Sequence, residues 1–267
     1  MNRRVAGTAA AALAVAALTS FAPLSGQAPA GRPSYTPPRT SRGQPNLQGI
    51  WQAMNSAAWN IEDHGGATGV PAGKSVVEGG PLPYLPAALA KRNQNFANRK
   101  TDDPESKCWL PGVPRITYMP FPFQILQFDR YVVINYEYLN TTRYIYTDGT
   151  PSPDADVIDF FMGSSNGKWE GNTLVVDVTN NNDRTWFDRA GNHHSDAMRL
   201  VERYTPMGPD HIQYDVTVTD PKTFSRPWKM SMPLYRRVDH VPELLEYECY
   251  AYAEEDAETA APGGSAK

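Results

Sequence analysis

The residues best suited to acid–base chemistry are two adjacent histidines, His193 and His194, which follow a polar and aromatic stretch that contains Asp183. An imidazole can act as a general acid or base near neutral pH when a carboxylate orients it. Neighbouring residues of an extended segment point to opposite sides, so at most one of the two histidines is expected to serve. The competing interpretation is a turn over 189–192 that leaves both histidines exposed beside it.

A second acid–base candidate is the tripeptide Glu62-Asp63-His64, which precedes two glycines. On a loop, these residues can bring a base and an acid to the mouth of a cavity. A polar surface turn is the competing interpretation. The catalytic candidates are therefore His64 and the histidine pair, with Asp183 as the orienting carboxylate, and Glu62 is a candidate for ligand binding.

The candidate ligand-binding residues combine an arginine with aromatic rings. Arg143, Tyr118 and Trp186 can bind a carboxylate or a phenolate, because a guanidinium pairs with anions and stacks on aromatic faces. The proline-stiffened segment 118–123 ends at Phe123 and is expected to form a wall of either the core or a pocket. Cross-strand packing is the competing interpretation for the arginine group.

Several function classes lack their usual sequence signals. The five histidines show no H-x-H or H-E-x-x-H spacing and the two cysteines no C-x-x-C spacing, so no metal site is expected. There is no G-x-S-x-G, P-loop or G-x-G-x-x-G motif, and no cofactor is expected. The net charge of −4 opposes a nucleic-acid partner. A small-molecule ligand is the expected partner.

The strand that positions the histidine pair is the clearest structural signal in the chain. Gly171-Asn172 can make a tight turn, and 173–179 reads as a β-branched strand. The apolar run 157–162 is expected to pair with it in antiparallel fashion, with 163–167 as the hairpin loop. This strand would deliver the polar and aromatic loop that follows it to one end of a sheet.

The remaining elements predict a mainly β fold. One helix is expected over 87–99, and its basic side chains, Lys91, Arg92, Arg99 and Lys100, are interpreted as a solvated face. Strands with turn signals between them indicate an antiparallel β-barrel of lipocalin-like type or a sandwich, with long Pro-rich loops. Beyond the pair above, the expected strands are 46–51, 124–128, 131–139, 143–147, 198–204, 212–219, 228–235 and 244–250.

The N-terminus has the pattern of an export signal. Arg3-Arg4 precede an apolar, small-residue run, and Ala28-Pro29-Ala30 resembles a cleavage site. The expected organisation is a signal peptide over 1–30, a flexible linker over 31–45, one β-rich domain over 46–253 and a disordered tail over 254–267. An exported protein, periplasmic or extracellular, without a stable membrane span after signal removal is therefore predicted.

The two cysteines, Cys108 and Cys249, are far apart in the sequence. In an oxidising compartment such a pair is a candidate disulfide, which would tie the middle of the chain to its C-terminal part. The competing interpretation is two buried free thiols.

Several blocks together resemble a family of exported bacterial proteins, most of them without an assigned activity. The blocks include C-W-L-P-G-V-P-R, M-P-F-P-F-Q-I, W-E-G-N-T-L-V-V-D-V, T-W-F-D-R-A-G-N-H-H-S and E-Y-E-C. The resemblance implies a signal peptide, an all-β body and the paired cysteines, and it names no reaction. The chain departs from the family pattern at Asn172, Ser152 and Tyr250-Ala251, where relatives tend to have Asp, His and His-Glu.

Three functions remain open at this point. The first is an exported barrel that binds a small aromatic or amphipathic molecule. The second is a cofactor-independent acid–base enzyme, a lyase, isomerase or hydrolase, on the same barrel. The third is a structural envelope protein with a filled core. Whether the chain is an enzyme and how it assembles are left undecided.

Overall fold

The computed structural model describes residues 35–238, 243–252 and 254. They belong to a compact unit that begins at Tyr35. The predicted signal peptide over 1–30 lies outside the described residues.

Of the predicted tail over 254–267, the structure describes only residue 254. The described part of the predicted linker makes a small turn, in which the Thr40 N–H donates to the Gln44 carbonyl at 2.9 Å. Within the described ranges, no helix is long and apolar enough to cross a membrane.

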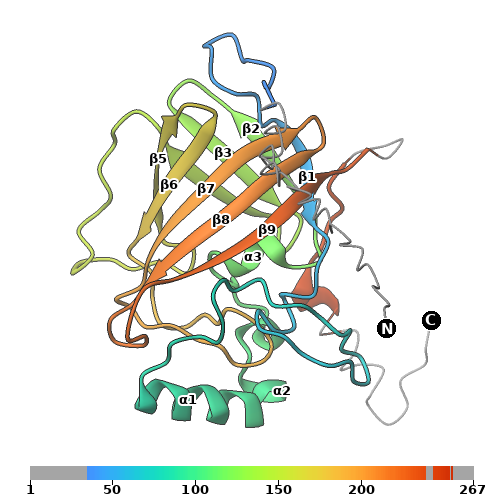
Figure 1. Cartoon of the computed structure of the whole chain (residues 1–267), viewed down its shortest axis with the longest axis vertical. Helices are drawn as coiled ribbons and strands as arrows, with labels where there is room; N and C mark the ends of the chain where they lie inside the picture. The colour runs from blue at the N-terminus through green and yellow to red at the C-terminus, as the bar shows by residue number, and fades with distance from the viewer. Residues whose placement is uncertain (1–34, 239–242, 253, 255–267) are drawn as a thin grey trace, which may run out of the picture. The chain divides into compact units, whose positions relative to one another are not determined.

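Nine strands close into a single barrel (Figure 1), so the mainly β prediction is confirmed as a barrel rather than a sandwich. Each strand pairs with the next along the chain, and β9 pairs back with β1. The strands are β1 (Gly49–Ala53), β2 (Phe123–Gln127), β3 (Tyr131–Tyr136), β4 (Thr141–Tyr146), β5 (Ser164–Glu170), β6 (Thr173–Thr179), β7 (Arg199–Gly208), β8 (His211–Thr219) and β9 (Trp228–Arg236).

The barrel is not purely antiparallel. Eight of its nine strand pairs are antiparallel, and β4 and β5 run parallel. A closed ring with an odd number of strands cannot alternate direction all the way round, so one parallel pair is unavoidable. Parallel neighbours need a crossover connection instead of a tight hairpin. The long segment 147–163 between β4 and β5 supplies it.

The prediction for the strand that pairs with β6 in a hairpin was wrong. The partner of β6 is β5, so 157–162 is not a strand and 163–167 is not a loop. The turn at Gly171-Asn172 joins β5 to β6 as predicted. A Cβ on Gly167 would lie 2.7 Å from Cγ2 of Ile145, so a glycine there lets β4 and β5 approach. Pairing on both edges thus outweighs the low strand propensity of this stretch.

The predicted closing strand over 244–250 was also wrong. In this segment a single isolated bridge joins Tyr247 to Tyr138, and residues 249–250 are helical. The expected helix is present as α1 (Pro86–Ala97), which begins with a proline whose fixed φ suits a first helical position. The short helical segments that the structure adds are α2 (Arg99–Asp102), η1 (Pro104–Lys107) and α3 (Arg115–Tyr118).

The barrel interior is filled by side chains that also include an ion pair. Arg143 of β4 and Glu202 of β7 are buried and form an ion pair, and Arg143 Nε donates to Ser165 Oγ at 3.0 Å. The hydroxyl of Tyr214 donates to Glu202 Oε1 at 2.6 Å. Burial raises the pKa of Tyr214, and the negative charge of Glu202 adds to this effect. Apolar side chains of the strands pack around this group to form the core.

Candidate functional site

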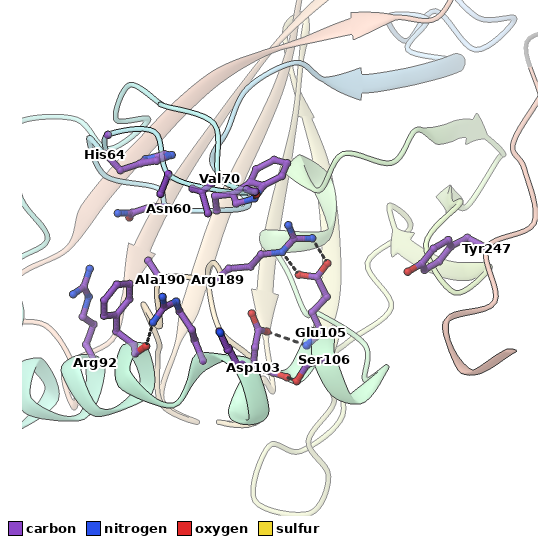
Figure 2. Close-up of a pocket in the computed structure, with 17 residues that line it drawn as sticks. Asn60, His64, Val70, Arg92, Asp103, Glu105, Ser106, Arg189, Ala190 and Tyr247 are labelled. Atoms are coloured by element: carbon purple, nitrogen blue, oxygen red, sulfur yellow. Dashed lines mark hydrogen bonds and ion pairs between the residues drawn. The ribbon is translucent and has the colours of Figure 1, made fainter. Parts of the chain in front are cut away.

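The main pocket lies outside the barrel interior and has a volume of about 690 Å³ (Figure 2). Its helical wall comes from α1, α2 and η1, which lie beyond one end of the barrel in Figure 1. Loop 59–70 forms the opposite wall, and residues 189–190 and Tyr247 complete the lining. The pocket is therefore assembled from four stretches that are distant in the sequence.

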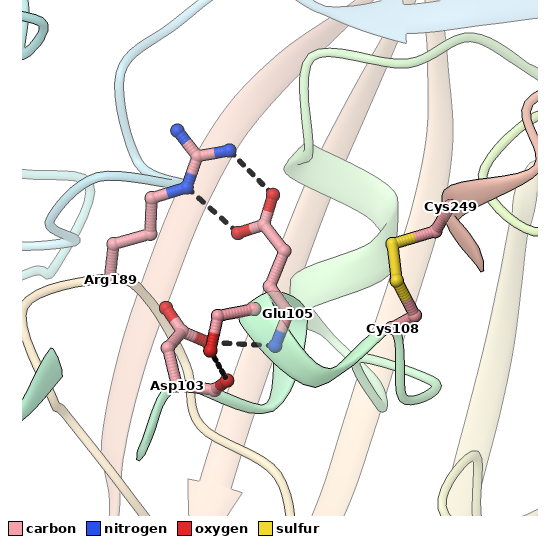
Figure 3. Close-up of a disulfide and its surroundings, with 6 residues drawn as sticks. Asp103, Glu105, Cys108, Arg189 and Cys249 are labelled. Atoms are coloured by element: carbon pink, nitrogen blue, oxygen red, sulfur yellow. Dashed lines mark hydrogen bonds and ion pairs between the residues drawn. A yellow bond between two sulfur atoms is a disulfide. The ribbon is translucent and has the colours of Figure 1, made fainter. Parts of the chain in front are cut away.

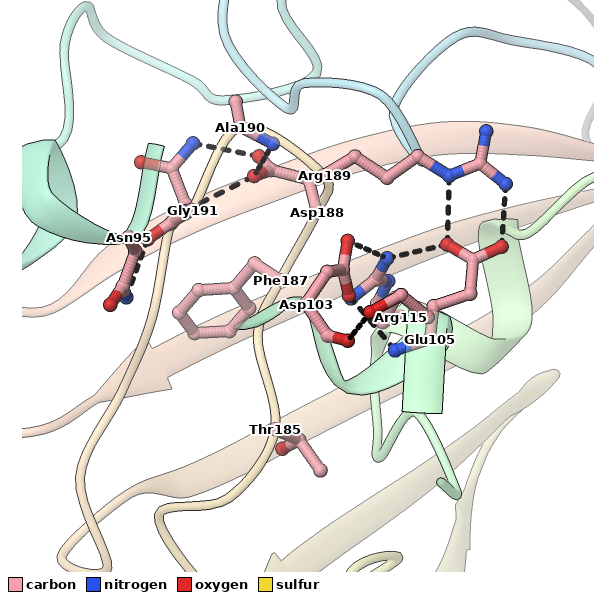
Figure 4. Close-up of polar contacts among 12 residues, drawn as sticks. Asn95, Asp103, Glu105, Arg115, Thr185, Phe187, Asp188, Arg189, Ala190 and Gly191 are labelled. Atoms are coloured by element: carbon pink, nitrogen blue, oxygen red, sulfur yellow. Dashed lines mark hydrogen bonds and ion pairs between the residues drawn. The ribbon is translucent and has the colours of Figure 1, made fainter. Parts of the chain in front are cut away.

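Helix α1 is held against the loop that follows β6 by close backbone contact. Gly191 has a left-handed φ of +83°, and a Cβ at this position would lie 2.8 Å from the backbone nitrogen of Phe96. Asn95 Nδ2 also donates to the Gly191 carbonyl at 3.2 Å (Figure 4). Glycine supplies both the φ and the space, so this contact fixes the helical wall of the pocket.

A buried carboxylate, Asp188, holds the opposite wall. Asp188 Oδ2 accepts from the Ile61 N–H at 2.9 Å and from Asn192 Nδ2 at 2.7 Å, and Oδ1 accepts from the Ala190 N–H at 2.9 Å. Burial raises the pKa of Asp188 to about 6, against the effect of these hydrogen bonds. The Arg189 N–H donates to the Ala58 carbonyl at 3.0 Å, which ties the same two loops together.

An ion cluster forms the floor between η1 and the 187–190 loop (Figure 4). Arg115 donates to Asp103 in bidentate fashion, at 2.8 and 3.0 Å, and to Glu105 Oε2 at 2.7 Å. Arg189 Nε donates to the same Glu105 oxygen at 2.7 Å. Burial acts to raise the pKa of Glu105, but the two guanidinium groups outweigh it and hold the pKa below its usual value. Both carboxylates are thus fully engaged by arginine.

The predicted disulfide between Cys108 and Cys249 is present (Figure 3). The two Cα atoms are 5.6 Å apart across a sequence separation of 141. The bond anchors the C-terminal segment beside η1. Tyr247, two positions before the second cysteine, packs on Phe121 with ring centroids 4.6 Å apart and lines the pocket.

Cationic side chains lie over part of the surface of two aromatic rings in the pocket. The guanidinium of Arg189 lies 4.8 Å from the Trp59 ring centroid. The guanidinium groups of Arg92 and Arg99 lie 5.5 and 4.2 Å from the Phe96 ring centroid. These contacts give the pocket flat apolar faces with positive charge above them.

The histidine pair and Asp183 come together at a second, smaller pocket of about 240 Å³. Lys91, Lys222 and Ser195 also line it. The predicted clustering of the acid–base candidates therefore has a structural counterpart outside the main pocket. Figure 2 does not include it.

The rings of both histidines are oriented by groups other than Asp183. His194 contacts the Ser195 carbonyl through Nδ1 at 3.0 Å, so Nδ1 is the donor, and its Nε2 lies 2.7 Å from the Thr185 hydroxyl. His193 Nε2 donates to the Ala88 carbonyl at 3.0 Å, which leaves Nδ1 as a bare acceptor. No partner for this Nδ1 is present among the described residues.

Both imidazoles are held neutral by burial. Desolvation lowers the pKa of His194 to about 4 and also lowers the pKa of His193. An unprotonated imidazole can accept a proton but does not supply one at neutral pH.

The other two loop candidates, His64 and Glu62, line different pockets. His64 lines the main pocket, where its Nδ1 donates to the Glu62 carbonyl at 2.8 Å. Glu62 instead lines a third pocket of about 430 Å³ and accepts from the Leu82 N–H at 3.0 Å.

The predicted arginine–aromatic group is not brought together at a pocket. Arg143 is paired inside the barrel, and the hydroxyl of the buried Tyr118 donates to the Phe187 carbonyl at 2.7 Å. Phe123 is a core residue at the start of β2, packed on the Tyr136 ring at 5.4 Å. Trp186 is buried in the loop after β6, where it bridges to His193.

Sequence reasoning missed most of the main pocket. It interpreted the basic residues of the helix as a solvated face, yet Arg92, Arg99 and Lys100 line the pocket together with Phe96. The available signal was their spacing, because residues three, four and seven apart share one face of a helix. Trp59 and Arg189 carried no comparable pattern.

Comparison of the chain with protein-family models, curated proteins and solved structures finds no match. The resemblance to exported bacterial proteins thus stays a prediction, while the cysteine pairing that it implies is present. Over the residues that the structure describes, no group of three or more His, Cys, Asp or Glu side chains is arranged to hold a metal ion.

Proposed function

We propose that this protein binds a small aromatic or amphipathic molecule in the main pocket. The observation that supports it is a cavity of about 690 Å³ outside a filled barrel. Ligand pockets typically measure roughly 300–1,000 Å³ and combine apolar walls with a few polar groups. Apolar surface is supplied here by Trp59, Val70, Phe96 and Tyr247. Charged side chains also line the pocket.

The distribution of packing favours this pocket over the barrel interior. The side chains that fill the barrel are buried against one another, including the Arg143–Glu202 pair. In the main pocket, by contrast, Phe96 is 43% exposed on the helical wall. A large apolar ring that the protein itself leaves half uncovered can gain contact from a ligand.

The test is binding of a neutral aromatic probe, N-phenyl-1-naphthylamine, followed by its fluorescence. Phe96→Ala removes an apolar face and is expected to weaken binding by roughly tenfold, the equivalent of about 1.4 kcal/mol. Phe128→Ala is the matched control, because Phe128 is 49% exposed and lies outside the pocket. Absence of binding, or equal losses in the two variants, would overturn the proposal and favour a structural envelope role.

Export is proposed together with this function. A disulfide between distant cysteines supports an oxidising compartment, because such bonds are rare in reducing cytosol. Mass spectrometry of the natural protein should find a mature chain that begins near residue 31. Recovery of the uncut chain from the cytoplasmic fraction would contradict export.

A second candidate function is acid–base catalysis at the smaller pocket. It is favoured by His193, whose Nε2–H is fixed by the Ala88 carbonyl while its Nδ1 has no partner among the described residues. A neutral imidazole nitrogen with a fixed tautomer can accept a proton, and this Nδ1 is a buried atom of a residue that lines the pocket. In a substrate screen, His193→Ala should abolish any turnover that His211→Ala, on an exposed histidine, leaves intact. Equal turnover in both variants would exclude this role for His193.

A further inference from the structure

We infer that the ligand of the main pocket carries an acidic group, bound by Arg92, Arg99 and Lys100 of the helical wall. This inference rests on the proposed ligand-binding function of the same pocket. It assigns the ligand to one chemical class, an aromatic or other apolar body with a carboxylate or similar anionic group.

The lining of the main pocket has an excess of positive charge. The lining contains four cationic side chains, Arg92, Arg99, Lys100 and Arg189, and two carboxylates, Asp103 and Glu105. The whole chain has a net charge of −4, so this local excess of positive charge runs against the average. A concave site of one sign concentrates ligands of the opposite sign.

The two carboxylates of the lining, Asp103 and Glu105, are neutralised by arginine side chains other than those of α1 and α2. Asp103 accepts a bidentate pair of hydrogen bonds from the guanidinium of Arg115, which lies buried behind the lining, and a third from the Glu105 N–H. Glu105 accepts from that arginine and from Arg189. Neither carboxylate therefore compensates the three cations of α1 and α2.

The three cations of the helical wall, Arg92, Arg99 and Lys100, have no carboxylate partner among the described residues. Arg99 donates to the Phe96 carbonyl at 2.7 Å, and Arg92 reaches only amide oxygens, at 3.4 Å. Arginines on the barrel surface are paired instead, as Arg199 is with Asp177 and Arg203 with Glu170. Guanidinium donors without an anion bind carboxylates in bidentate fashion.

Positive charge and apolar surface lie side by side in the main pocket. The guanidinium groups of Arg92 and Arg99 lie over the Phe96 ring, which restricts their motion. Figure 2 shows Arg92 on the helical wall, and Val70 on the loop across the pocket. An acidic group placed on the helical wall therefore leaves the rest of the ligand against Val70 and Trp59.

The test compares two probes that share one aromatic body. 8-Anilinonaphthalene-1-sulfonate carries an anionic group that the neutral N-phenyl-1-naphthylamine lacks. We expect the wild-type protein to bind the sulfonate about tenfold more tightly, the contribution of one charge-assisted contact. Arg92→Gln with Arg99→Gln should weaken binding of the sulfonate by about tenfold relative to the neutral probe, and so remove this preference.

Arg226→Gln is the matched control, because Arg226 is exposed, lies outside the pocket and forms no ion pair with any described residue; it donates a hydrogen bond to the Pro227 carbonyl. Its preference for the sulfonate should equal that of the wild type. Equal affinity of the wild type for both probes, or equal losses of both probes in the double variant, would overturn the inference and leave the ligand-binding function standing. Failure of both probes to bind the wild type would instead overturn the proposed function itself.

Discussion

The barrel interior and the main pocket both contain arginines beside aromatic rings, but they neutralise positive charge differently. Inside the barrel, Arg143 is buried and is paired with Glu202, whose carboxylate also accepts from Tyr204 and Tyr214. At the pocket, Arg99 has a carbonyl oxygen and an aromatic ring as partners and stays half-buried. The first arrangement is complete without a ligand, whereas the second has donors left over.

The two regions therefore differ in whether they can take a ligand. A buried ion pair whose two charged groups are both hydrogen-bonded is rigid and closed to water. It positions strands but offers no site to a ligand. The pocket, assembled from loops and a helix at the end of that rigid barrel, combines fixed walls with unsatisfied groups.

The largest expected effect comes from breaking the buried pair. Glu202→Gln keeps the shape of the side chain and leaves the buried guanidinium of Arg143 without a counter-charge. The free energy of unfolding should fall by about 3–5 kcal/mol, as measured by urea denaturation. Glu170→Gln removes a carboxylate from an exposed ion pair with Arg203 and should leave stability nearly unchanged.

A second substitution separates lost charge pairing from lost packing. Adding Arg143→Met to the Glu202→Gln variant removes the unpaired charge and should recover part of the lost stability. No recovery would mean that the loss comes from packing and not from the unpaired guanidinium, and the contrast between the two regions would fail.

Local sequence patterns predicted the barrel well because strands are encoded locally. Runs such as 212–219 alternate and are rich in β-branched residues, and the structure places β8 within one residue of that prediction. The same patterns failed at β5, whose residues Ser164 to Gly167 have low strand propensity and pair only because both neighbouring strands are present.

The pocket could not be predicted for a related reason. Its walls come from 59–70, 92–106, 189–190 and Tyr247, and only long-range contacts bring them together. The direction of a strand side chain was equally hidden. Glu202 and Arg203 are adjacent in β7, yet the first faces the core and the second pairs outside with Glu170.

The next effect in size concerns the contact that fixes the helical wall. Gly191→Ala forces a side chain into a left-handed φ and toward the backbone of α1, so we expect a loss of about 2–4 kcal/mol. Gly171→Ala is the matched control, because Gly171 has φ +60° and nothing within 4 Å of a Cβ. Only the Gly191 variant should also weaken probe binding. Equal probe affinity in the two variants would show that α1 does not depend on this contact.

A pH-dependent effect is expected from His194, a buried histidine that lines the smaller pocket. The pKa of His194 is lowered to about 4 in the folded protein, and the unfolded value is about 6.5. The unfolded chain therefore binds more protons between these values, so stability falls as the pH drops from about 6.5 to about 4. This contribution amounts to about 3 kcal/mol over the full window.

His194→Asn retains a donor for the Ser195 carbonyl and cannot be protonated in this range. The difference in unfolding free energy between wild type and variant should therefore shrink or reverse as the pH is lowered from 7 to 4. The raised pKa of Asp188 acts with the opposite sign between about 4 and 6, but it is present in both proteins and cancels in the difference. A pH-independent difference would show that His194 is not held neutral.

The smallest expected effect is also the most direct test of the contrast between the two regions. Arg99→Gln and Arg143→Gln are the same substitution, one at the pocket and one inside the barrel. Arg99 forms no ion pair with any described residue and has Arg92 and Lys100 as neighbours of like charge in the pocket lining, so its loss should change the free energy of unfolding by less than about 0.5 kcal/mol. Arg143→Gln leaves Glu202 buried without its counter-charge and should cost several kcal/mol, roughly 3–5. If urea denaturation gave similar losses for both, the pocket arginine would be a structural residue, and its free donors would no longer indicate a ligand.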